Sequence, residues 1–394
     1  MTKVGKRLVF FYIIVGLAVF LYSFTQIDLG MTLTEMSIWR AIQTSFQYIG
    51  YFLRPLSTGI YCTLIAILFI LSGITLYEAA KKTLTKRDMW SIAGVIAATV
   101  GLSYPAFSYD LFNYMFSAKT IILYGKNPYT VIPLQFTGFE PWLSFMHWTH
   151  APSIYPPFWI ALTIIPFVLG FDIFLLTLWN FKVLMILSYL VSVWAIAKTL
   201  DHEKHNSVLG MAIYATSPIV IIEGLVSGHN DIVMMVFALL SIVAFSQRKR
   251  ITSWLLLFFS IGIKIMTLFL IPSLFFKSRR WPMLGLMILA LLAIFTQREF
   301  YPWYFLWIIP FVALLPEVRF LTILAFGFSL GLLSRYVPFL YFGLWDSFAI
   351  SFRWWGMGIS VGLSLIVALI VDWKILGTTF KKNKHVLKIP NSKY

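Results

Sequence analysis

Long apolar runs alternate with short polar segments along the whole chain. A helix needs about 20 apolar residues to cross the core of a bilayer. We therefore predict an all-α, polytopic membrane protein with about 11–13 membrane segments, some of them short or re-entrant. The runs lie at 8–25, 57–79, 89–107, 156–171, 173–197, 207–226, 230–246, 251–276, 281–296, 303–316, 317–334 and 355–373.

The composition supports this prediction. Hydrophobic residues make up 60% of the 394 residues and charged residues 12%, whereas soluble globular proteins carry about 25% charged residues. Soluble enzymes, disordered chains and coiled coils are therefore excluded. The single cysteine, Cys62, also excludes an intrachain disulfide framework.

The basic residues, 31 Lys and Arg against 15 Asp and Glu, cluster between the apolar runs. Cytoplasmic segments of membrane proteins retain Lys and Arg, so we assign these clusters and both termini to the cytoplasm. They indicate the lipid bilayer as a partner and no nucleic acid, because no soluble domain exists to bind one. The clusters are 3–7, 81–87, 198–204, 248–250, 277–280, Arg319 and the tail 374–393.

Two apolar runs conflict with this orientation. The run 251–276 lies between two clusters that are both assigned to the cytoplasm, so we predict a hairpin of two half-length helices with 262–264 near its tip. The Pro-rich run 156–171 is predicted to be short or re-entrant. Irregular backbone at membrane depth requires burial in protein or a cavity. Misplaced span boundaries are the alternative.

The longest polar interval, 108–155, follows the span 89–107 and is predicted to be extracytoplasmic. Two of its pieces, 110–124 and 139–149, mix aromatic and polar residues and are predicted to be helices at the membrane interface. The interval also carries four acidic or imidazole side chains, namely Asp110, Glu140, His147 and His150.

Asp110 stands just beyond the outer end of a span. A carboxylate at that position could act as the general base for an acceptor hydroxyl. The alternative is a helix N-cap, because an Asp before an apolar run accepts hydrogen bonds from free backbone N–H groups.

A second polar cluster, Gly228-His229-Asn230-Asp231, follows Glu223 between two apolar runs. It could hydrogen-bond a sugar or a phosphate, or it could cap the next helix. His229 and Asp231 supply two metal ligands at most, so we predict no metal site.

Two lysines lie within apolar runs, where an unpaired charge costs several kcal/mol. We expect Lys264 to face a cavity, a carboxylate or an anionic ligand, with snorkelling to a helix end as the alternative. Lys182 is expected to pair with Asp172 or another carboxylate.

Seven cations are assigned to the outside, against the usual bias. A positive extracytoplasmic set suits a site for a phosphate at the outer leaflet. Arg298 precedes the aromatic residues Tyr301 and Tyr304, which could equally form an interfacial belt. The seven are Arg40, Arg54, Lys119, Lys126, Arg298, Arg335 and Arg353.

In the order of its motifs the chain resembles the GT-C glycosyltransferases, membrane enzymes that use polyprenyl-phosphate sugars. Among these it is most similar to the bacterial polyprenol-phosphate-mannose-dependent mannosyltransferases. The motifs are Asp110 with Tyr114, Gly125-Lys126-Asn127-Pro128-Tyr129, Tyr155-Pro156-Pro157, Ser217-Pro218 through Glu223 to Asp231, Lys264 through Pro272, and Tyr301-Pro302-Trp303-Tyr304 through Trp307.

The resemblance covers 89–310, which would form a GT-C-like catalytic module within a single transmembrane domain. An extra pair of spans at 1–80 and the C-terminal spans and basic tail at 317–394 fall outside it. Many members of the family carry a second acidic residue beside the first, whereas here the neighbours are Tyr109 and Leu111. Glu140 is the candidate for that second carboxylate.

The resemblance implies that Asp110 is the general base and that Lys264 and Arg298 hold the lipid phosphate. The further candidates for substrate binding are Tyr114, Lys126, Asn127, Tyr129, Glu140, His147, His150, Tyr155, Glu223, His229, Asn230, Asp231, Tyr301 and Tyr304.

The expected reaction moves a mannose-like hexose from a polyprenyl-phosphate sugar to a lipid, glycan or protein hydroxyl on the extracytoplasmic face, with inversion. We expect a monomer that needs neither a cofactor nor a divalent metal. A non-catalytic flippase or transporter of lipid-linked sugars is one alternative, although such proteins often contain paired repeats and none is found. A polysaccharide polymerase or ligase is the other, and only a product assay separates it.

Overall fold

The computed structural model describes residues 1–276 and 279–386, with only the backbone of 372–386. Every regular element in these ranges is helical. Five helices are long and apolar enough to cross a membrane, and a bent pair makes a sixth candidate span. The predicted all-α, polytopic membrane class is therefore confirmed. Lys277 and the tail residues 387–394 lie outside the described residues.

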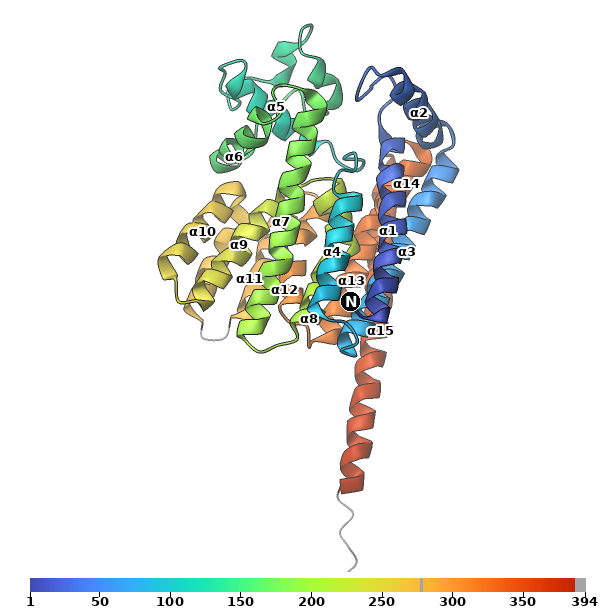
Figure 1. The fold of residues 1–394 in the computed structure, drawn as a ribbon, viewed down its shortest axis with the longest axis vertical. Coiled ribbons are helices and arrows are strands. Elements are labelled where there is room, and N and C mark those ends of the chain that lie inside the picture. Colours follow the sequence, from blue (N-terminus) through green and yellow to red (C-terminus); the bar gives the residue numbers. More distant parts are fainter. Residues whose placement is uncertain (277–278, 387–394) are drawn as a thin grey trace, which may run out of the picture.

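The helices form one bundle that carries a cap of shorter elements at one end (Figure 1). The five long spans are α1 (Lys3–Ser23) with η1 (Phe24–Gln26), α3 (Arg54–Ala80), α7 (Phe174–His202), α13 (Arg319–Ser334) with α14 (Tyr336–Phe342), and α15 (Ser347–Val386). The bent pair consists of α8 (Ser207–Ala215) and the π-helix η5 (Val220–Val226), at 62° to each other.

Shorter helices complete both parts of the molecule. Those that complete the bundle are α4 (Lys86–Val100), α9 (Asp231–Ser246), α10 (Arg250–Ile263), η6 (Ile265–Phe275), α11 (Arg280–Phe295), η7 (Pro302–Trp307) and α12 (Ile309–Ala313). Those at the capped end are α2 (Ser37–Gln47), η2 (Tyr48–Phe52), α5 (Asp110–Ile122), η3 (Pro133–Phe136), η4 (Pro141–Phe145) and α6 (Pro157–Val168).

The basic segments gather at the end of the bundle opposite the cap. Lys86 pairs with Asp201 at 2.6 Å, and Arg280 pairs with Glu203 at 2.8 Å, so three inter-helix connections meet there. The N-terminus and the lower part of α15 lie toward the same end in Figure 1. The basic segments between helices thus mark the end of the bundle that lies opposite the cap.

The run 251–276 folds as the predicted hairpin. The Ser260 hydroxyl donates to Thr267 Oγ1 at 2.9 Å, and the rings of Trp254 and Phe275 lie 6.3 Å apart. Lys264 stands between α10 and η6 in extended conformation, with φ −159°. The chain returns to its starting side, where the Arg279 guanidinium lies 3.5 Å from the centre of the Phe245 ring near the start of the hairpin.

The structure corrects three details of the predicted elements. The span expected at 89–107 ends at Val100, and residues around Pro105 form turns because Pro cannot donate the helical hydrogen bond. The helix expected at 139–149 is reduced to the short 3-10 helix η4. The helix α5 forms, but residues 111–120 are all buried, so it lies inside the protein rather than at the membrane interface.

Lys182 does not pair with a carboxylate, contrary to the prediction. Its ammonium is buried and donates to the carbonyl oxygens of Leu225 and Val226, the latter at 2.8 Å. These carbonyls stand at the end of η5, where a helix lacks internal partners. Asp172 pairs instead with Lys119, at 2.9 Å.

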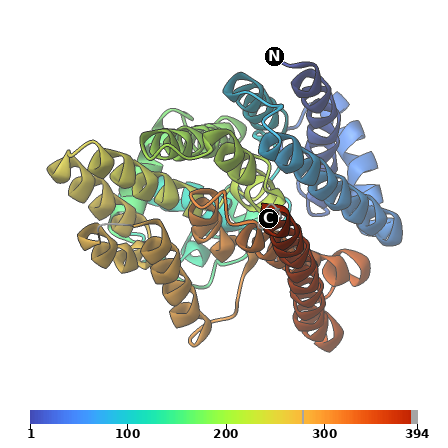
Figure 2. The ribbon, with the colours of Figure 1, turned by 90° about the horizontal axis from the view of Figure 1, so that it is seen from below.

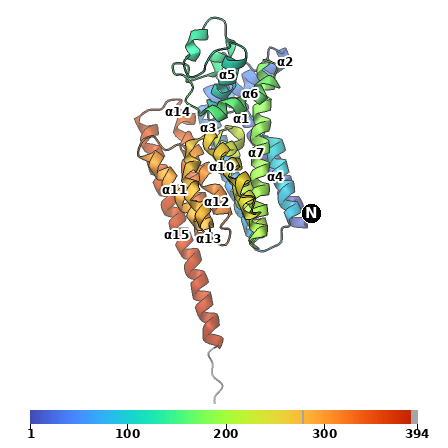
Figure 3. The ribbon, with the colours of Figure 1, turned by 90° about the vertical axis from the view of Figure 1, so that its left-hand side faces the viewer.

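The long helix α15 packs against α13 on one side of the bundle and runs past it (Figures 2 and 3). Small residues allow the close approach: a Cβ atom at Gly327 would lie 2.1 Å from Ser364 Oγ, and one at Gly331 would lie 2.8 Å from Met357 Cα. Small residues at helix interfaces are the usual means of packing helices within a membrane.

Candidate active site

A cavity of about 1410 Å³ lies between the cap and the bundle. Its wall combines residues from the start of α5, from the cap loop, from the tip of the α10–η6 hairpin and from α14 and α15. Seven residues predicted from the sequence line it, namely Asp110, His147, Tyr155, Lys264, Arg298, Tyr301 and Tyr304.

The structure places the other predicted residues outside the cavity lining. Five are buried beneath the wall, namely Tyr114, Glu223, His229, Asn230 and Asp231. Four lie exposed on the cap loop, namely Lys126, Asn127, Tyr129 and His150. Glu140 is buried within the cap, where it pairs with Lys119 at 3.0 Å and accepts a hydrogen bond from Tyr124. Glu140 therefore stabilises the cap and is not beside Asp110.

Asp110 is the first residue of α5 and faces the cavity with one-fifth of its side chain exposed. The turns around Pro105 separate α4, which ends at Val100, from α5, which begins at Asp110 at the capped end. A negative side chain in a first helical turn is favourable because it faces the positive end of the helix dipole. Tyr109 holds the N-cap position of α5, and the first N–H, that of Asp110, donates to the Ser108 hydroxyl at 3.3 Å. The Asp110 side chain itself accepts no hydrogen bond from the first turn, so the N-cap alternative finds no support in the geometry.

His229 lies directly behind Asp110 and is fully buried. Its Nδ1 atom is 3.5 Å from Asp110 Oδ2, and its Nε2 atom is 3.3 Å from Glu223 Oε2. The Tyr336 hydroxyl donates to Glu223 Oε1 at 2.9 Å. Glu223 thus faces Asp110 across the imidazole ring of His229 and makes no direct contact with it.

Asp231 and Lys264 form an ion pair at the tip of the hairpin. The Lys264 ammonium lies 2.8 and 3.0 Å from the two oxygens of Asp231. The Trp307 indole N–H donates to the same carboxylate. Asp231 is fully buried, whereas 23% of the Lys264 side chain is exposed, and Lys264 lines the cavity. Of the alternatives for Lys264, the structure shows both a carboxylate partner and a cavity.

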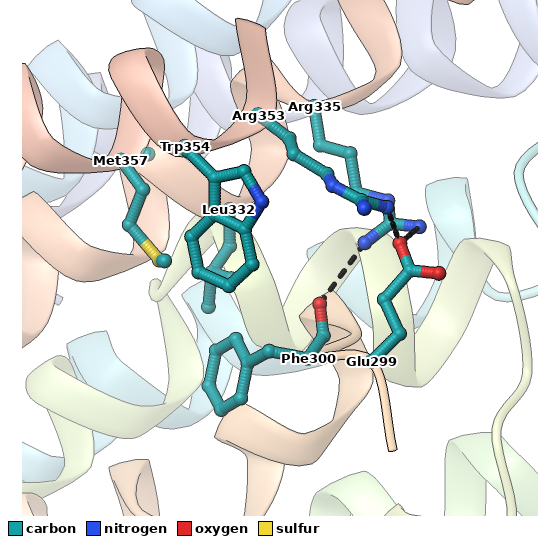
Figure 4. A pocket seen from close by; sticks show the side chains of 8 residues that line it. Glu299, Phe300, Leu332, Arg335, Arg353, Trp354 and Met357 are labelled. Atoms are coloured by element: carbon teal, nitrogen blue, oxygen red, sulfur yellow. Dashed lines mark hydrogen bonds and ion pairs between the residues drawn. The ribbon is translucent and has the colours of Figure 1, made fainter. Parts of the chain in front are cut away.

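Two arginines in the cavity wall share one carboxylate. Arg335 and Arg353 converge on the carboxylate of Glu299, and Arg335 also donates to the Phe300 carbonyl oxygen at 3.0 Å (Figure 4). Two guanidinium groups against one carboxylate leave a net positive charge. Arg54 and Arg298 also line the cavity, so four of the seven cations assigned to the outside share it.

Asp28 lines the cavity near Asp110 and was not predicted from the sequence. Its carboxylate accepts a hydrogen bond from the Tyr51 hydroxyl. The Tyr109 hydroxyl lies 3.1 Å from each of the two carboxylate oxygens. His147 lies 3.6 Å from the carboxylate and stacks on the Tyr109 ring. The sequence alone could not identify Asp28, because its partner Tyr109 lies 81 positions away in the chain.

Among the described residues, no group of three or more His, Cys, Asp or Glu side chains is arranged to hold a metal ion. The family described as alpha-(1->6)-mannopyranosyltransferase, N-terminal domain, matches residues 13–280, which is more than half of the chain. No curated protein matches the chain, and neither does any solved structure.

Proposed function

We propose a function from the premise that the chain belongs to the alpha-(1->6)-mannopyranosyltransferase family and is a multi-pass membrane mannosyltransferase of the GT-C type. The proposal is that it transfers a mannose-like hexose from a polyprenyl-phosphate sugar to a hydroxyl acceptor on the extracytoplasmic face. Asp110 would serve as the general base, and the anomeric configuration would invert.

One observation carries the role of Asp110. Three carboxylates line the cavity within the described residues: Asp28, Asp110 and Glu299. Asp28 already accepts from two tyrosine hydroxyls, and Glu299 is held by two arginines. Asp110 has His229 behind it and keeps part of its side chain open to the cavity. It is therefore the carboxylate best able to accept a proton from a bound hydroxyl.

The cavity suits a lipid-linked donor on two grounds. Apolar side chains from η6 and α11, among them Ile265, Leu268 and Ile294, line the wall beside Lys264. They offer apolar contact for an isoprenoid tail, while Lys264 and Arg298 border the position of its phosphate. Because Asp231 neutralises much of the Lys264 charge, the excess charge of the Arg335–Arg353 pair supports the same anionic ligand.

The reaction would then proceed in one displacement. Asp110 takes the proton from the acceptor hydroxyl, and the acceptor oxygen forms a bond to the anomeric carbon. The bond from that carbon to the phosphate oxygen breaks, and the lipid phosphate leaves with the electron pair. The surrounding cations would stabilise the leaving phosphate, a role for which we propose no divalent metal and no cofactor.

A transfer assay tests the proposal. The purified protein is incubated with radiolabelled polyprenyl-phosphate mannose and a membrane-lipid extract as the source of acceptors, alongside polyprenyl-phosphate glucose and a nucleotide-linked mannose. We expect label to move from the mannosyl lipid to an acceptor and not from the nucleotide sugar. Movement of intact lipid-linked sugar across a vesicle membrane without transfer would establish the flippase alternative. A ladder of polymeric products would establish the polymerase or ligase.

A further inference from the structure

The buried array behind Asp110 has no part in the displacement described above. Glu223 and His229 are both fully buried, yet each is ionisable. Ionised groups are costly to remove from water unless they are paired. Their burial next to the proposed base therefore calls for a function in the reaction.

Local backbone structure places both side chains behind Asp110, Glu223 against His229 and His229 against Asp110. Glu223 stands within the π-helix η5, a rare conformation that occurs frequently at functional sites. Gly228 follows with φ +75°, a conformation that glycine adopts without strain, and turns the chain into α9. The ring of His229 is held flat against Trp303, with centroids 4.2 Å apart and planes 22° apart. The orientation of the imidazole is thus set by packing.

Each ring nitrogen of His229 faces a different carboxylate, Asp110 on one side and Glu223 on the other. We propose that Glu223 is a positioning residue for the transfer reaction and acts through His229, which holds one oxygen of Asp110 so that the other faces the acceptor hydroxyl. This inference rests on the proposed function. Glu223 itself does not line the cavity, so it would touch neither substrate.

The charges of the array balance as the reaction proceeds. Before transfer, an imidazolium lies between two carboxylates. When Asp110 takes the acceptor proton it becomes neutral, and the remaining His229–Glu223 pair is neutral as a whole. A neutral imidazole would instead leave two carboxylates facing each other without a cation between them. Proton transfer to Asp110 therefore creates no unpaired buried charge.

The protonation of His229 follows from its neighbours. Burial alone would lower the pKa of His229, but the carboxylates of Asp110 and Glu223 on its two sides raise it to about 9. The groups that face the ring are Asp110 from α5, Glu223 from η5 and the Trp303 indole from η7. The ring lies in the turn between η5 and α9, outside both of these segments.

The test compares Glu223→Gln with wild type in the mannosyl-transfer assay across pH 5–10. We expect kcat to fall by roughly tenfold or more, because a positioned base contributes about 10²–10⁴-fold, while KM for the donor stays within about threefold. Removing the negative neighbour lowers the pKa of His229, so the alkaline limb of kcat should move from near pH 9 to lower pH.

Two further variants keep the test decisive. Tyr336→Phe removes the hydroxyl that donates to Glu223. The carboxylate then keeps its charge with one donor fewer and favours the imidazolium of His229 more strongly, so the alkaline limb should move a little toward higher pH, even if Glu223→Gln fails to fold. Glu317→Gln is the matched control, because Glu317 also pairs with a histidine, His205, at 2.7 Å but at the opposite end of the bundle. It should change neither kcat nor the limb.

A kcat within about threefold of wild type, or an unmoved alkaline limb in Glu223→Gln, would overturn the positioning role. Failure of the proposed function looks different, because wild-type protein would then show no transfer at all. In that case NMR titration of ¹⁵N-labelled histidine decides, with His229→Gln to assign the signal. A His229 signal that titrates at the same pH in wild type and Glu223→Gln would overturn the proposal.

Discussion

The Lys264 ammonium binds both oxygens of the Asp231 carboxylate, at 2.8 and 3.0 Å, and so ties the hairpin tip to the start of α9. The two residues are 33 positions apart in the chain. The pair explains how the chain holds a charge at the turn between two half-length helices. It also leaves part of the cation exposed to the cavity, where an anionic ligand can share it.

Replacing Lys264 should destabilise the protein more than replacing Asp231. Lys264→Met leaves the buried carboxylate of Asp231 with the Trp307 N–H alone, and we expect a loss of about 3–5 kcal/mol. Asp231→Asn should cost less, because Lys264 can turn toward the cavity. The Lys264→Met, Asp231→Asn double variant should recover part of the loss. Thermal unfolding of the detergent-solubilised protein measures all three.

Lys86→Met is the control for that series. Lys86 and Asp201 form an ion pair whose side chains are 49% and 41% exposed, and such pairs contribute about 0–1 kcal/mol. A loss at Lys264 no larger than the loss at Lys86, or strictly additive effects in the double variant, would show that the buried pair does not stabilise the tip.

Asp28 should make the capped end sensitive to acid. It follows the end of the first span, at Gln26. Burial opposes its ionisation, but the nearby His147 ring and the hydrogen bonds from Tyr51 and Tyr109 outweigh burial and lower the pKa of the carboxyl below 3.8. The stabilisation is therefore present above pH 3.8 and is lost as pH falls through the lowered pKa.

Thermal unfolding of wild type and Asp28→Asn between pH 7 and pH 3 checks this expectation. At neutral pH wild type should be more stable by about 1–2 kcal/mol, because its carboxylate accepts charge-assisted hydrogen bonds. The difference should shrink toward pH 3. A difference that stays constant over the whole range would assign the effect of the variant to packing rather than to the charge.

Charge patterning predicted the larger features of the molecule correctly. Two basic clusters flanking 251–276 were enough to predict a hairpin, because lysines and arginines fix the side on which a chain must return. Cations on the other side predicted a common site, and Arg54, Arg298, Arg335 and Arg353 all line one cavity. Asp110 faces the same cavity, although the helix before it already ends at Val100 and Asp110 begins a new helix.

The partners of His229 could not be predicted, because they come from α5, η5 and η7 and no periodicity relates these elements. The same limit explains Glu140, a candidate for the second carboxylate from its place in the cap loop. Its actual partner, Lys119, lies on the buried face of α5, and that burial was not visible in a segment of mixed polarity.

Sidedness gives a direct test of the proposed topology. In a Cys62→Ser background, Thr137→Cys places a thiol on the exposed cap loop and His202→Cys places one at the basic end. We expect a membrane-impermeant maleimide to label Thr137→Cys in intact cells and His202→Cys only after permeabilisation. The reverse pattern would put the cavity on the cytoplasmic side, and with it the site of transfer.

Asp110→Asn should abolish transfer while leaving donor binding nearly intact. The amide keeps the size of the side chain and can still contact His229, but it cannot accept a proton from the acceptor hydroxyl. We expect kcat to fall by about 10²–10⁴-fold, the usual contribution of a general base. A helix-capping role would predict little change, because Asn caps helices as well as Asp does.

The measurement is single-turnover transfer from labelled polyprenyl-phosphate mannose, with donor binding and membrane expression determined on the same preparation. Asp201→Asn, an exposed carboxylate at the basic end, is the matched control and should retain wild-type turnover. If Asp110→Asn kept more than about a tenth of wild-type turnover, Asp110 would not be the base. The role would then pass to Asp28, because Glu299 is held between two guanidinium groups and Glu223 does not reach the cavity.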